Sequence, residues 1–259
     1  MNKLVIGNIK MNIVSKIERD NYFKSIREGM RRKKFQNSSI IFCPPIIHLE
    51  SFAKSIKNKN IFFGVQNAYW ENSGAFTGEV SSAMASELGA KFQIIGHSER
   101  RASFNETDDI VNKKIISAFK NNLIPIMCIG ESLKEKESGE TKNIILKQLN
   151  EGLEGISKNK ISKLAIAYEP IWSISTSGDG KIPTAEEIMG VRILIQKILA
   201  DKFDLTIKQM PKILYGGSVD YKNVKEVCLN AGMSGVLVGG ESLYPASFIK
   251  IVEVLEEDE

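Results

Sequence analysis

A (β/α)8 barrel is the fold that this sequence predicts, and three observations predict it. Eight short apolar runs recur along the 259 residues, most of them rich in Ile, Val, Leu and Phe. Their apolar residues are consecutive instead of alternating, as expected of parallel strands covered on both faces. Segments with helical spacing separate the runs, and no linker divides the chain. We therefore expect a single domain over residues 1–259, with a doubly wound open sheet as the competing architecture.

The expected strands are the apolar runs themselves. In chain order they are Leu4 to Ile9, Ile40 to Cys43, Ile61 to Val65, Phe92 to Ile95, Ile124 to Ile129, Leu164 to Ala167, Lys212 to Tyr215 and Gly235 to Val238. In this architecture the active site lies at the carboxyl ends of the strands. The residues that follow each run are therefore the first place to look for function.

Helices are expected where apolar residues recur at three- and four-residue spacing. The sets are Ile17, Phe23 and Ile26 before the second strand, Ile110, Val111, Ile115, Ile116 and Phe119 before the fifth, and Ile144, Ile145, Gln148 and Leu149 before the sixth. The clearest amphipathic helix carries Ile188, Val191, Ile195, Ile198 and Leu199. It begins at Thr184-Ala185-Glu186-Glu187, which has the spacing of a capping box.

Composition narrows the class of protein. With 42% hydrophobic residues, the chain can bury a sizeable core without disulfides, and its three separated cysteines suit a reducing compartment. The apolar run Leu4 to Ile6 is too short for a signal peptide, and no stretch is long enough to span a membrane, so we expect a cytoplasmic protein. The net charge of +4 is small, and the basic run 31–34 is offset by the acidic residues 256–259. Neither a nucleic-acid partner nor a membrane is expected.

Polar and glycine residues follow five of the expected strands, and the barrel would gather them on one rim. They are Asn8 and Lys10 after the first strand, Gly96-His97-Ser98-Glu99-Arg100-Arg101 after the fourth, Glu169 after the sixth, Gly216-Gly217-Ser218 after the seventh and Gly239-Gly240-Glu241-Ser242 after the eighth. This rim would hold a carboxylate, an imidazole, an ammonium group and two glycine turns.

The carboxylate of Glu169 is the candidate base. Pro170 ends the sixth strand there, and residues 173–180 predict an exposed loop. A lone glutamate at a strand end is usually a solvated loop residue, so the argument that Glu169 is catalytic depends on the other residues of the rim. His97 precedes a helical turn whose dipole disfavours the imidazolium, and a neutral imidazole suits the polarisation of a carbonyl group. Lys10 would supply fixed positive charge beside an oxyanion, and Schiff-base chemistry is less expected.

The two glycine turns favour a phosphorylated small substrate. Glycine pairs commonly make tight turns and no more, but barrels often bind phosphate at backbone N–H groups after the last two strands. The two histidines lack metal-ligand spacing, and neither a cysteine cluster nor a G-x-G-x-x-G motif is present. We therefore expect no metal and no cofactor.

Seven motifs occur in a fixed order along the chain. They are Gly7-Asn8-Ile9-Lys10-Met11-Asn12, Gln66-Asn67, Gly74-Ala75-Phe76-Thr77-Gly78-Glu79-Val80-Ser81, Ile94-Ile95-Gly96-His97-Ser98-Glu99-Arg100-Arg101, Ala167-Tyr168-Glu169-Pro170-Ile171-Trp172, Tyr215-Gly216-Gly217-Ser218-Val219 and Leu237-Val238-Gly239-Gly240. On this ordered set the chain closely resembles the triosephosphate isomerase family over essentially its whole length.

The resemblance implies an enzyme of glycolysis and gluconeogenesis that interconverts dihydroxyacetone phosphate and D-glyceraldehyde 3-phosphate without cofactor or metal. In the established mechanism of the family, Glu169 would move a proton between neighbouring carbons through an enediolate. Neutral His97 would polarise the substrate oxygens, Lys10 would stabilise their negative charge and Asn8 would help to position the substrate. Glu99 would support these groups from behind.

The resemblance also implies how the phosphate is held. It would bind the backbone N–H groups of Ser175, Ser218, Gly239 and Gly240, and the loop from Pro170 to about Lys181 would close over it. The family is homodimeric, and the loop Gly74 to Glu79 matches the one that enters the neighbouring subunit, where Thr77 would support the partner's active site. From sequence alone, this loop could equally be an ordinary surface excursion.

Three departures from the family pattern stand out. Ile9 replaces a tryptophan, which we interpret as a packing change. Residues 173–177 lack the usual glycines, and we hypothesise that Gly178 and Gly180 supply the hinge instead. Glu241 stands where a small residue is usual, and we expect it to face away from the phosphate. A non-catalytic phosphate-binding or interaction protein on the same barrel is the main alternative, ahead of a different phosphosugar enzyme.

Overall fold

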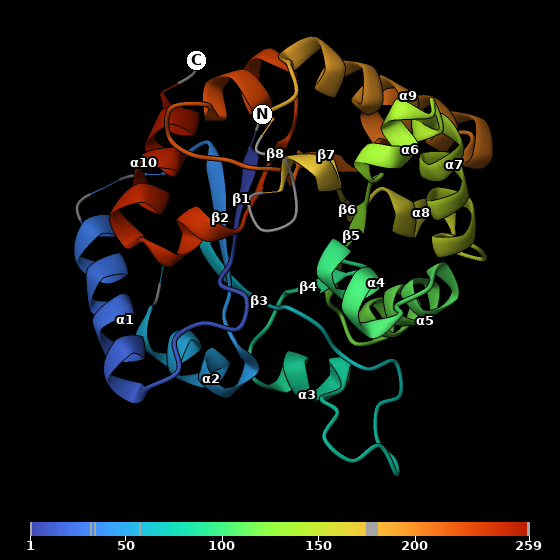
Figure 1. The fold of residues 1–259 in the computed structure, drawn as a ribbon. Helices are drawn as coiled ribbons and strands as arrows, with labels where there is room; N and C mark the ends of the chain where they lie inside the picture. The colour runs from blue at the N-terminus through green and yellow to red at the C-terminus, as the bar shows by residue number, and fades with distance from the viewer. Residues whose placement is uncertain (1, 32, 34, 57, 175–180, 258–259) are drawn as a thin grey trace.

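The computed structural model describes residues 2–31, 33, 35–56, 58–174 and 181–257. Across these ranges, parallel strands close into a barrel and helices surround it (Figure 1). The strands are β1 (Lys3–Asn8), β2 (Ser38–Cys43), β3 (Ile61–Val65), β4 (Phe92–Ile95), β5 (Ile124–Ile129), β6 (Ala165–Tyr168), β7 (Lys212–Tyr215) and β8 (Gly235–Val238). Because β8 pairs with β1, from Leu4 opposite Gly235 to Gly7 opposite Val238, the sheet is closed. The predicted barrel is confirmed and the open sheet is excluded.

Each expected strand is present, with small shifts at the ends. β1 stops at Asn8, one residue before the apolar run ends, and β6 is displaced by one residue toward its carboxyl end. β2 begins earlier than its apolar residues because Ser38 and Ser39 pair with Lys3 and Leu4 of β1. The backbone pairing therefore places Ser38 and Ser39 in the strand, although their polar side chains did not predict it.

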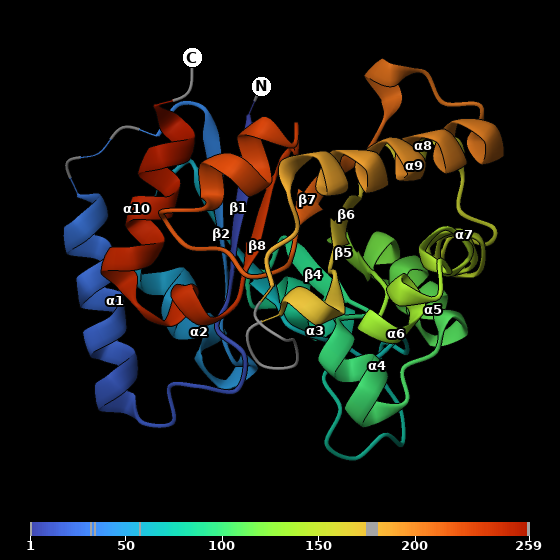
Figure 2. The ribbon, with the colours of Figure 1, turned by 45° about the horizontal axis from the view of Figure 1, so that its top comes forward.

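Helices connect the strands on the outside of the barrel. The α-helices are α1 (Lys16–Met30), α2 (Ile46–Ser55), α3 (Ser82–Glu87), α4 (Ser98–Phe104), α5 (Asp108–Lys120), α6 (Leu133–Glu137), α7 (Thr141–Gly152), α8 (Lys158–Ile161), α9 (Ala185–Phe203) and α10 (Pro245–Glu256). The 3-10 helices are η1 (Ile171–Ser173), η2 (Ile207–Gln209) and η4 (Gly240–Leu243), and η3 (Lys225–Asn230) is a π-helix. In both views α10 lies beside α1, so the first and last helices complete the ring (Figures 1 and 2).

The apolar core has two layers. Side chains such as Ile6, Ile94 and Leu214 fill the inside of the barrel, and a larger cluster packs between the strands and the helices. Ile9 is fully buried in this outer cluster, in agreement with its interpretation as a packing change. Both faces of the strands are therefore covered, which explains their continuous apolar runs.

The capping box at Thr184 forms as predicted, since its side chain accepts from Glu187 N and the Glu187 carboxylate accepts from Thr184 N. Ile17 lies in the helix expected before the second strand, but its side chain is 74% exposed. Six residues separate it from buried Phe23, which turns it roughly 240° around the helix axis. Ile17 therefore lies outside the stripe that faces the barrel.

Candidate active site

The alternation of side chains along β1 and β6 directs Asn8 and Glu169 to the inner side of the barrel at its rim. In β1, Leu4 and Ile6 belong to the inner core, and Asn8 continues the same face at the carboxyl end. In β6, Ala165 and Ala167 belong to that core, and Glu169 follows one residue beyond the strand. Because alternate residues of a strand share a face, the inward rows of both strands end in a polar side chain.

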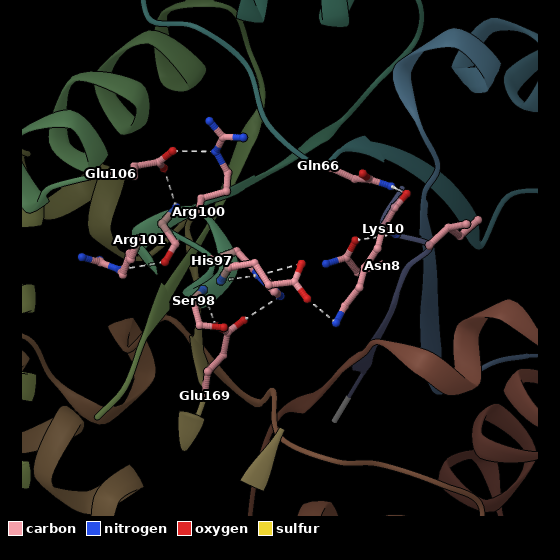
Figure 3. Close-up of polar contacts among 12 residues, drawn as sticks. Asn8, Lys10, Gln66, His97, Ser98, Arg100, Arg101, Glu106 and Glu169 are labelled. Atoms are coloured by element: carbon pink, nitrogen blue, oxygen red, sulfur yellow. Dashed lines mark hydrogen bonds and ion pairs between the residues drawn. The ribbon is translucent and has the colours of Figure 1, made fainter. Parts of the chain in front are cut away.

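Lys10 is held in an unusual backbone conformation. Its φ is 54°, a left-handed value that costs energy for a residue other than glycine. Its N–H donates to Asn8 Oδ1 at 3.1 Å, and its carbonyl accepts from Gln66 Nε2 at 2.9 Å. The Nζ donates to Glu99 Oε1 at 2.6 Å. This network fixes the ammonium group between two loops, with Asn8 beside it (Figure 3).

A second contact braces the same loop. Ile13 also has a left-handed φ, 64°, and its carbonyl lies 2.7 Å from Nε2 of His48, which is buried in α2. The sequence suggested no role for His48, because a histidine at the start of a helix has no signature of its own. Here it holds the strained segment that follows Lys10.

His97 stands at the amino end of α4 and caps it. Its Nδ1 accepts from the backbone N–H of Glu99 at 3.2 Å, so this nitrogen carries no proton. The proton of the neutral ring then resides on Nε2, which lies 3.5 Å from Glu169 Oε1. This is the arrangement in which a neutral imidazole can donate a hydrogen bond to a substrate oxygen.

Glu169 is almost completely buried, at 2% exposure. Its Oε2 accepts from the backbone N–H of Ser98 at 3.0 Å, while Oε1 makes no hydrogen bond within the described ranges. Figure 3 shows Glu169 next to His97 and Ser98, with Lys10 and Asn8 approaching from the β1 side. Glu169 is not among the residues that line the pocket at the carboxyl ends of β1, β7 and β8.

A pocket of about 120 Å³ lies at the carboxyl ends of β1, β7 and β8. It is lined by Asn8, Lys10, His97, Ile174, Gly216, Gly217, Ser218, Val219, Asp220, Leu237, Gly239, Gly240 and Glu241. Six of the residues proposed for the site from sequence therefore contribute to one cavity, namely Asn8, Lys10, His97, Ser218, Gly239 and Gly240. Ser175 lies outside the described residues, as does the hinge expected at Gly178 and Gly180. Thr77 lies on the exposed loop after β3, away from this pocket.

The start of the expected loop after β6 is not exposed, and that prediction is wrong for Ser173 and Ile174. Ser173 is fully buried in η1, and Ile174 is 7% exposed. The Ser173 hydroxyl pairs with Tyr215 Oη at 3.1 Å, and its carbonyl accepts from Ser218 N at 3.2 Å. These contacts tie the segment after Glu169 to the turn after β7.

Glu131, for which no role was predicted, supports that same segment. Its Oε1 accepts from Tyr168 Oη and from Trp172 Nε1, each at 3.0 Å. Burial raises the pKa of Glu131, although both hydrogen bonds act in the opposite direction. Glu131 thus joins the residues on either side of Glu169. A glutamate after an apolar strand resembles a surface residue, so no pattern could identify it.

A buried ion-pair cluster underlies His97. Glu106 Oε2 lies 2.6 Å from both Lys114 Nζ and Arg100 Nε, and Glu106 Oε1 accepts from Gly96 N at 3.0 Å. Burial by itself would raise the pKa of Glu106, but the charges and hydrogen bonds of Lys114 and Arg100 outweigh it and lower the pKa. The pKa of Lys114 is itself lowered by burial, against the attraction of Glu106. The cluster fixes the backbone that carries His97.

Acid should weaken this cluster. Because the pKa of Glu106 is lower in the folded protein, its stabilisation is present above the ordinary value of 4.5 and is lost as pH falls through the folded value. At neutral pH, Glu106→Gln should lower the free energy of unfolding by about 3–5 kcal/mol, because it leaves buried cations unpaired. Urea denaturation at fixed protein concentration measures both effects. The difference between wild type and variant should shrink toward low pH; a constant difference would contradict the assignment.

The described part of the chain holds no group of three or more His, Cys, Asp or Glu side chains placed to bind a metal ion. Nor does any described helix have the length and apolarity needed to cross a membrane.

The fold and the pocket together define a class, that of (β/α)8 barrels that gather ionisable side chains and glycine turns in a pocket at the carboxyl ends of their strands. A family model described as triosephosphate isomerase matches residues 3–255. The chain therefore belongs to the triosephosphate isomerase family.

Individual relatives agree with this placement. The chain is 42% identical over 251 residues to the triosephosphate isomerase of Dictyoglomus thermophilum, an alignment that covers 97% of this chain and 98% of that protein. It is 39% identical over 249 residues to that of Thermoanaerobacter pseudethanolicus, covering 96% and 98%. The crystal structure of triosephosphate isomerase from Bartonella henselae matches it with a TM-score of 0.85 at 29% identity, covering 99% of this chain and 100% of that one.

Proposed function

We propose that this protein interconverts dihydroxyacetone phosphate and D-glyceraldehyde 3-phosphate, with Glu169 as the base. The observation that carries the proposal is the geometry of one rim, where Lys10, His97 and the glycine turns share a pocket and Glu169 Oε1 lies 3.5 Å from His97 Nε2. Family membership supports the same reaction. Nothing in the fold or the comparisons favours the non-catalytic alternative.

In the proposed reaction, Glu169 takes a proton from one carbon of the substrate and returns it to the neighbouring carbon. His97 donates its Nε2 hydrogen to the substrate oxygens, and the ammonium group of Lys10 stabilises the charge of the enediolate. Asn8 Oδ1 positions Lys10 through the backbone N–H of that residue. Glu99 Oε1 lies 2.6 Å from Lys10 Nζ, and this ion pair supports a positioning role for Glu99.

Glu169 must move before it can act. Its Oε2 is bound to Ser98 N, and its side chain is excluded from the pocket lining. We infer that substrate binding and movement of the following segment break the Ser98 bond and turn the carboxylate toward the substrate. Ser173, tied to Tyr215 and Ser218, would link that segment to the phosphate turn.

The phosphate would lie against backbone N–H groups of Ser218, Gly239 and Gly240, and family membership adds the N–H of Ser175 to this proposed set. Gly239 has no Cβ, and one added there would lie 3.4 Å from Lys10 Cε. The turn after β8 therefore packs beside the Lys10 side chain.

The experiment that tests this function is a coupled assay of glyceraldehyde 3-phosphate conversion by the purified wild type. Turnover that requires Glu169 supports the proposal. A folded protein that binds inorganic phosphate but turns over no triose phosphate would support the non-catalytic alternative. Turnover of another phosphosugar in its place would indicate a different enzyme on the same barrel.

We also propose that the protein is a homodimer through the loop Gly74 to Glu79. All residues from 71 to 79 are exposed, and the loop projects beyond the ring of helices (Figure 1). The loop is nevertheless held by contacts at its base. Tyr69 N donates a hydrogen bond to Val80 O at 2.8 Å, and the centroids of the Tyr69 and Phe76 rings lie 4.6 Å apart. Exposed apolar side chains on neighbouring segments suit a self-complementary contact. They are Met11, Val14, Ile17, Ile47, Phe76 and Met84.

Thr77→Arg should separate the subunits and lower kcat by about a hundredfold, because a misplaced active-site loop loses its productive geometry. Sedimentation velocity reports the assembly, and the coupled assay reports kcat. Ile207→Arg is the matched control, since Ile207 is also highly exposed, at 89%, but lies on η2 before β7. A Thr77→Arg protein that stays dimeric and fully active would refute the role of the loop.

Two further features are proposed on the same basis. We propose that residues 1–259 form one domain, because strand pairing joins residues 4–7 to residues 235–238. A cytoplasmic location is proposed from the three cysteines, which are all buried and unbridged.

A further inference from the structure

The pocket carries an unfavourable charge arrangement for a site that binds phosphate. Among its described lining residues, Lys10 is a cation already paired with Glu99, and Asp220 and Glu241 are carboxylates. A carboxylate directed at a phosphate dianion would repel it. The directions in which these two acidic side chains point therefore decide how well the pocket binds its anion.

Asp220 is held by its own turn. Its Oδ1 accepts from Lys222 N at 2.7 Å and from Asn223 N at 2.8 Å. In return, Asn223 Oδ1 accepts from Asp220 N at 2.9 Å. Backbone donors satisfy this carboxylate and keep it at the start of the segment that leads to η3.

Glu241 is different, because its backbone is fixed while its side chain depends on a single hydroxyl group. It is the second residue of η4, which Ser242 anchors: its hydroxyl oxygen lies 2.6 Å from Gly239 O and 2.9 Å from Asn8 O, so its single hydrogen is shared between these two acceptors. The Glu241 carboxylate accepts from the hydroxyl of Ser247, in the first turn of α10. From the sequence we expect this carboxylate to face away from the phosphate; here it contacts α10, although Glu241 still lines the pocket.

The surroundings of Ser247 favour this orientation. α10 has neither a side-chain cap at Tyr244 nor an acidic residue of its own in the first turn. Through its contact with Ser247, the carboxylate of Glu241 therefore lies at the positive end of a helix, where negative charge is stabilised. The Ser247 hydroxyl selects one direction for a side chain that has three rotatable bonds.

We propose that Ser247 is a positioning residue that holds the Glu241 carboxylate away from the phosphate and thereby sets the affinity for phosphorylated substrate. The inference rests on the proposed function, since it gives a specific role to residues around the same anion pocket. Without the Ser247 hydroxyl, the carboxylate gains orientations toward the pocket. Binding of the ground state and of the transition state should then weaken equally, because the phosphate does not change during the reaction.

The test is a variant set measured with two probes. Ser247→Ala should raise the Michaelis constant for glyceraldehyde 3-phosphate and the calorimetric dissociation constant of inorganic phosphate by about tenfold, with kcat unchanged. Ser247→Thr keeps a hydroxyl group and should behave as wild type. Adding Glu241→Gln to Ser247→Ala should restore both constants, because it removes the repelling charge. The loss should also diminish at high salt, since screening weakens the repulsion.

Ser247→Cys, which keeps the shape of serine with a weak donor, gives a second disruption should Ser247→Ala fold poorly. Unchanged constants in both variants would overturn the proposal. So would a loss that Glu241→Gln fails to reverse, because the effect would then come from α10. If the wild type showed no triose phosphate turnover, the proposed function would fail, while inorganic phosphate binding would still test the Ser247 contact.

Discussion

Glu169→Gln should lower kcat/KM by about 10³- to 10⁴-fold, because the amide keeps the shape of the side chain and removes the base. Its oxygen can still accept from Ser98 N, so the backbone of α4 should be undisturbed. Binding of inorganic phosphate should change little, since Glu169 does not line the pocket. The coupled assay and phosphate calorimetry measure the two effects.

The stability of the same variant provides a second check. The Glu169 side chain is buried, and its Oε1 makes no hydrogen bond to the described residues, so replacing that oxygen breaks no hydrogen bond. The neutral amide should unfold at the same or a higher temperature. Glu151→Gln, at an exposed position of α7, is the control and should retain full activity. Substantial residual activity in Glu169→Gln would remove this residue from the role of base.

Lys10→Met should reduce kcat/KM by about 10²- to 10³-fold, because it removes the positive charge that is proposed to stabilise the developing oxyanion. The methionine stem can follow the same path, so the packing beside Gly239 should survive. Glu99 then loses its partner at 2.6 Å but is partly exposed and can be hydrated, so folding should be little affected. Steady-state kinetics and thermal unfolding together separate the two effects.

Lys208→Met is the matched control for this charge, because Lys208 is exposed in η2 near the start of β7. It should leave both kinetic constants unchanged. If Lys10→Met kept more than about a tenth of the activity, electrostatic stabilisation by Lys10 would be excluded as a main contribution.

The sequence revealed most of the barrel because consecutive apolar runs mark strands covered on both faces, and polarity begins abruptly where each strand ends. Asn8 and Glu169 could be placed on one rim by strand parity alone. Polar residues at the ends of strands were harder to predict. Ser38 belongs to β2 because its backbone pairs with Lys3, and its own side chain does not indicate a strand.

Supporting residues were the least predictable part of the site. Glu106 and Glu131 resemble solvated surface glutamates until the fold surrounds them with donors. Ser173 belongs to a stretch whose composition indicates a loop, and its burial comes from Tyr215, a residue distant in the chain. Contacts with other elements of the fold bury all three side chains, and local sequence patterns do not indicate such contacts.

Closure of the barrel between β1 and β8 has a consequence for how the chain is made. During synthesis β1 emerges first, and its edge has no partner until residues 235–238 have left the ribosome. α10, which packs against α1, emerges later still. The nascent chain must therefore carry an open sheet edge through almost the whole of translation, when it is most exposed to pairing with other chains.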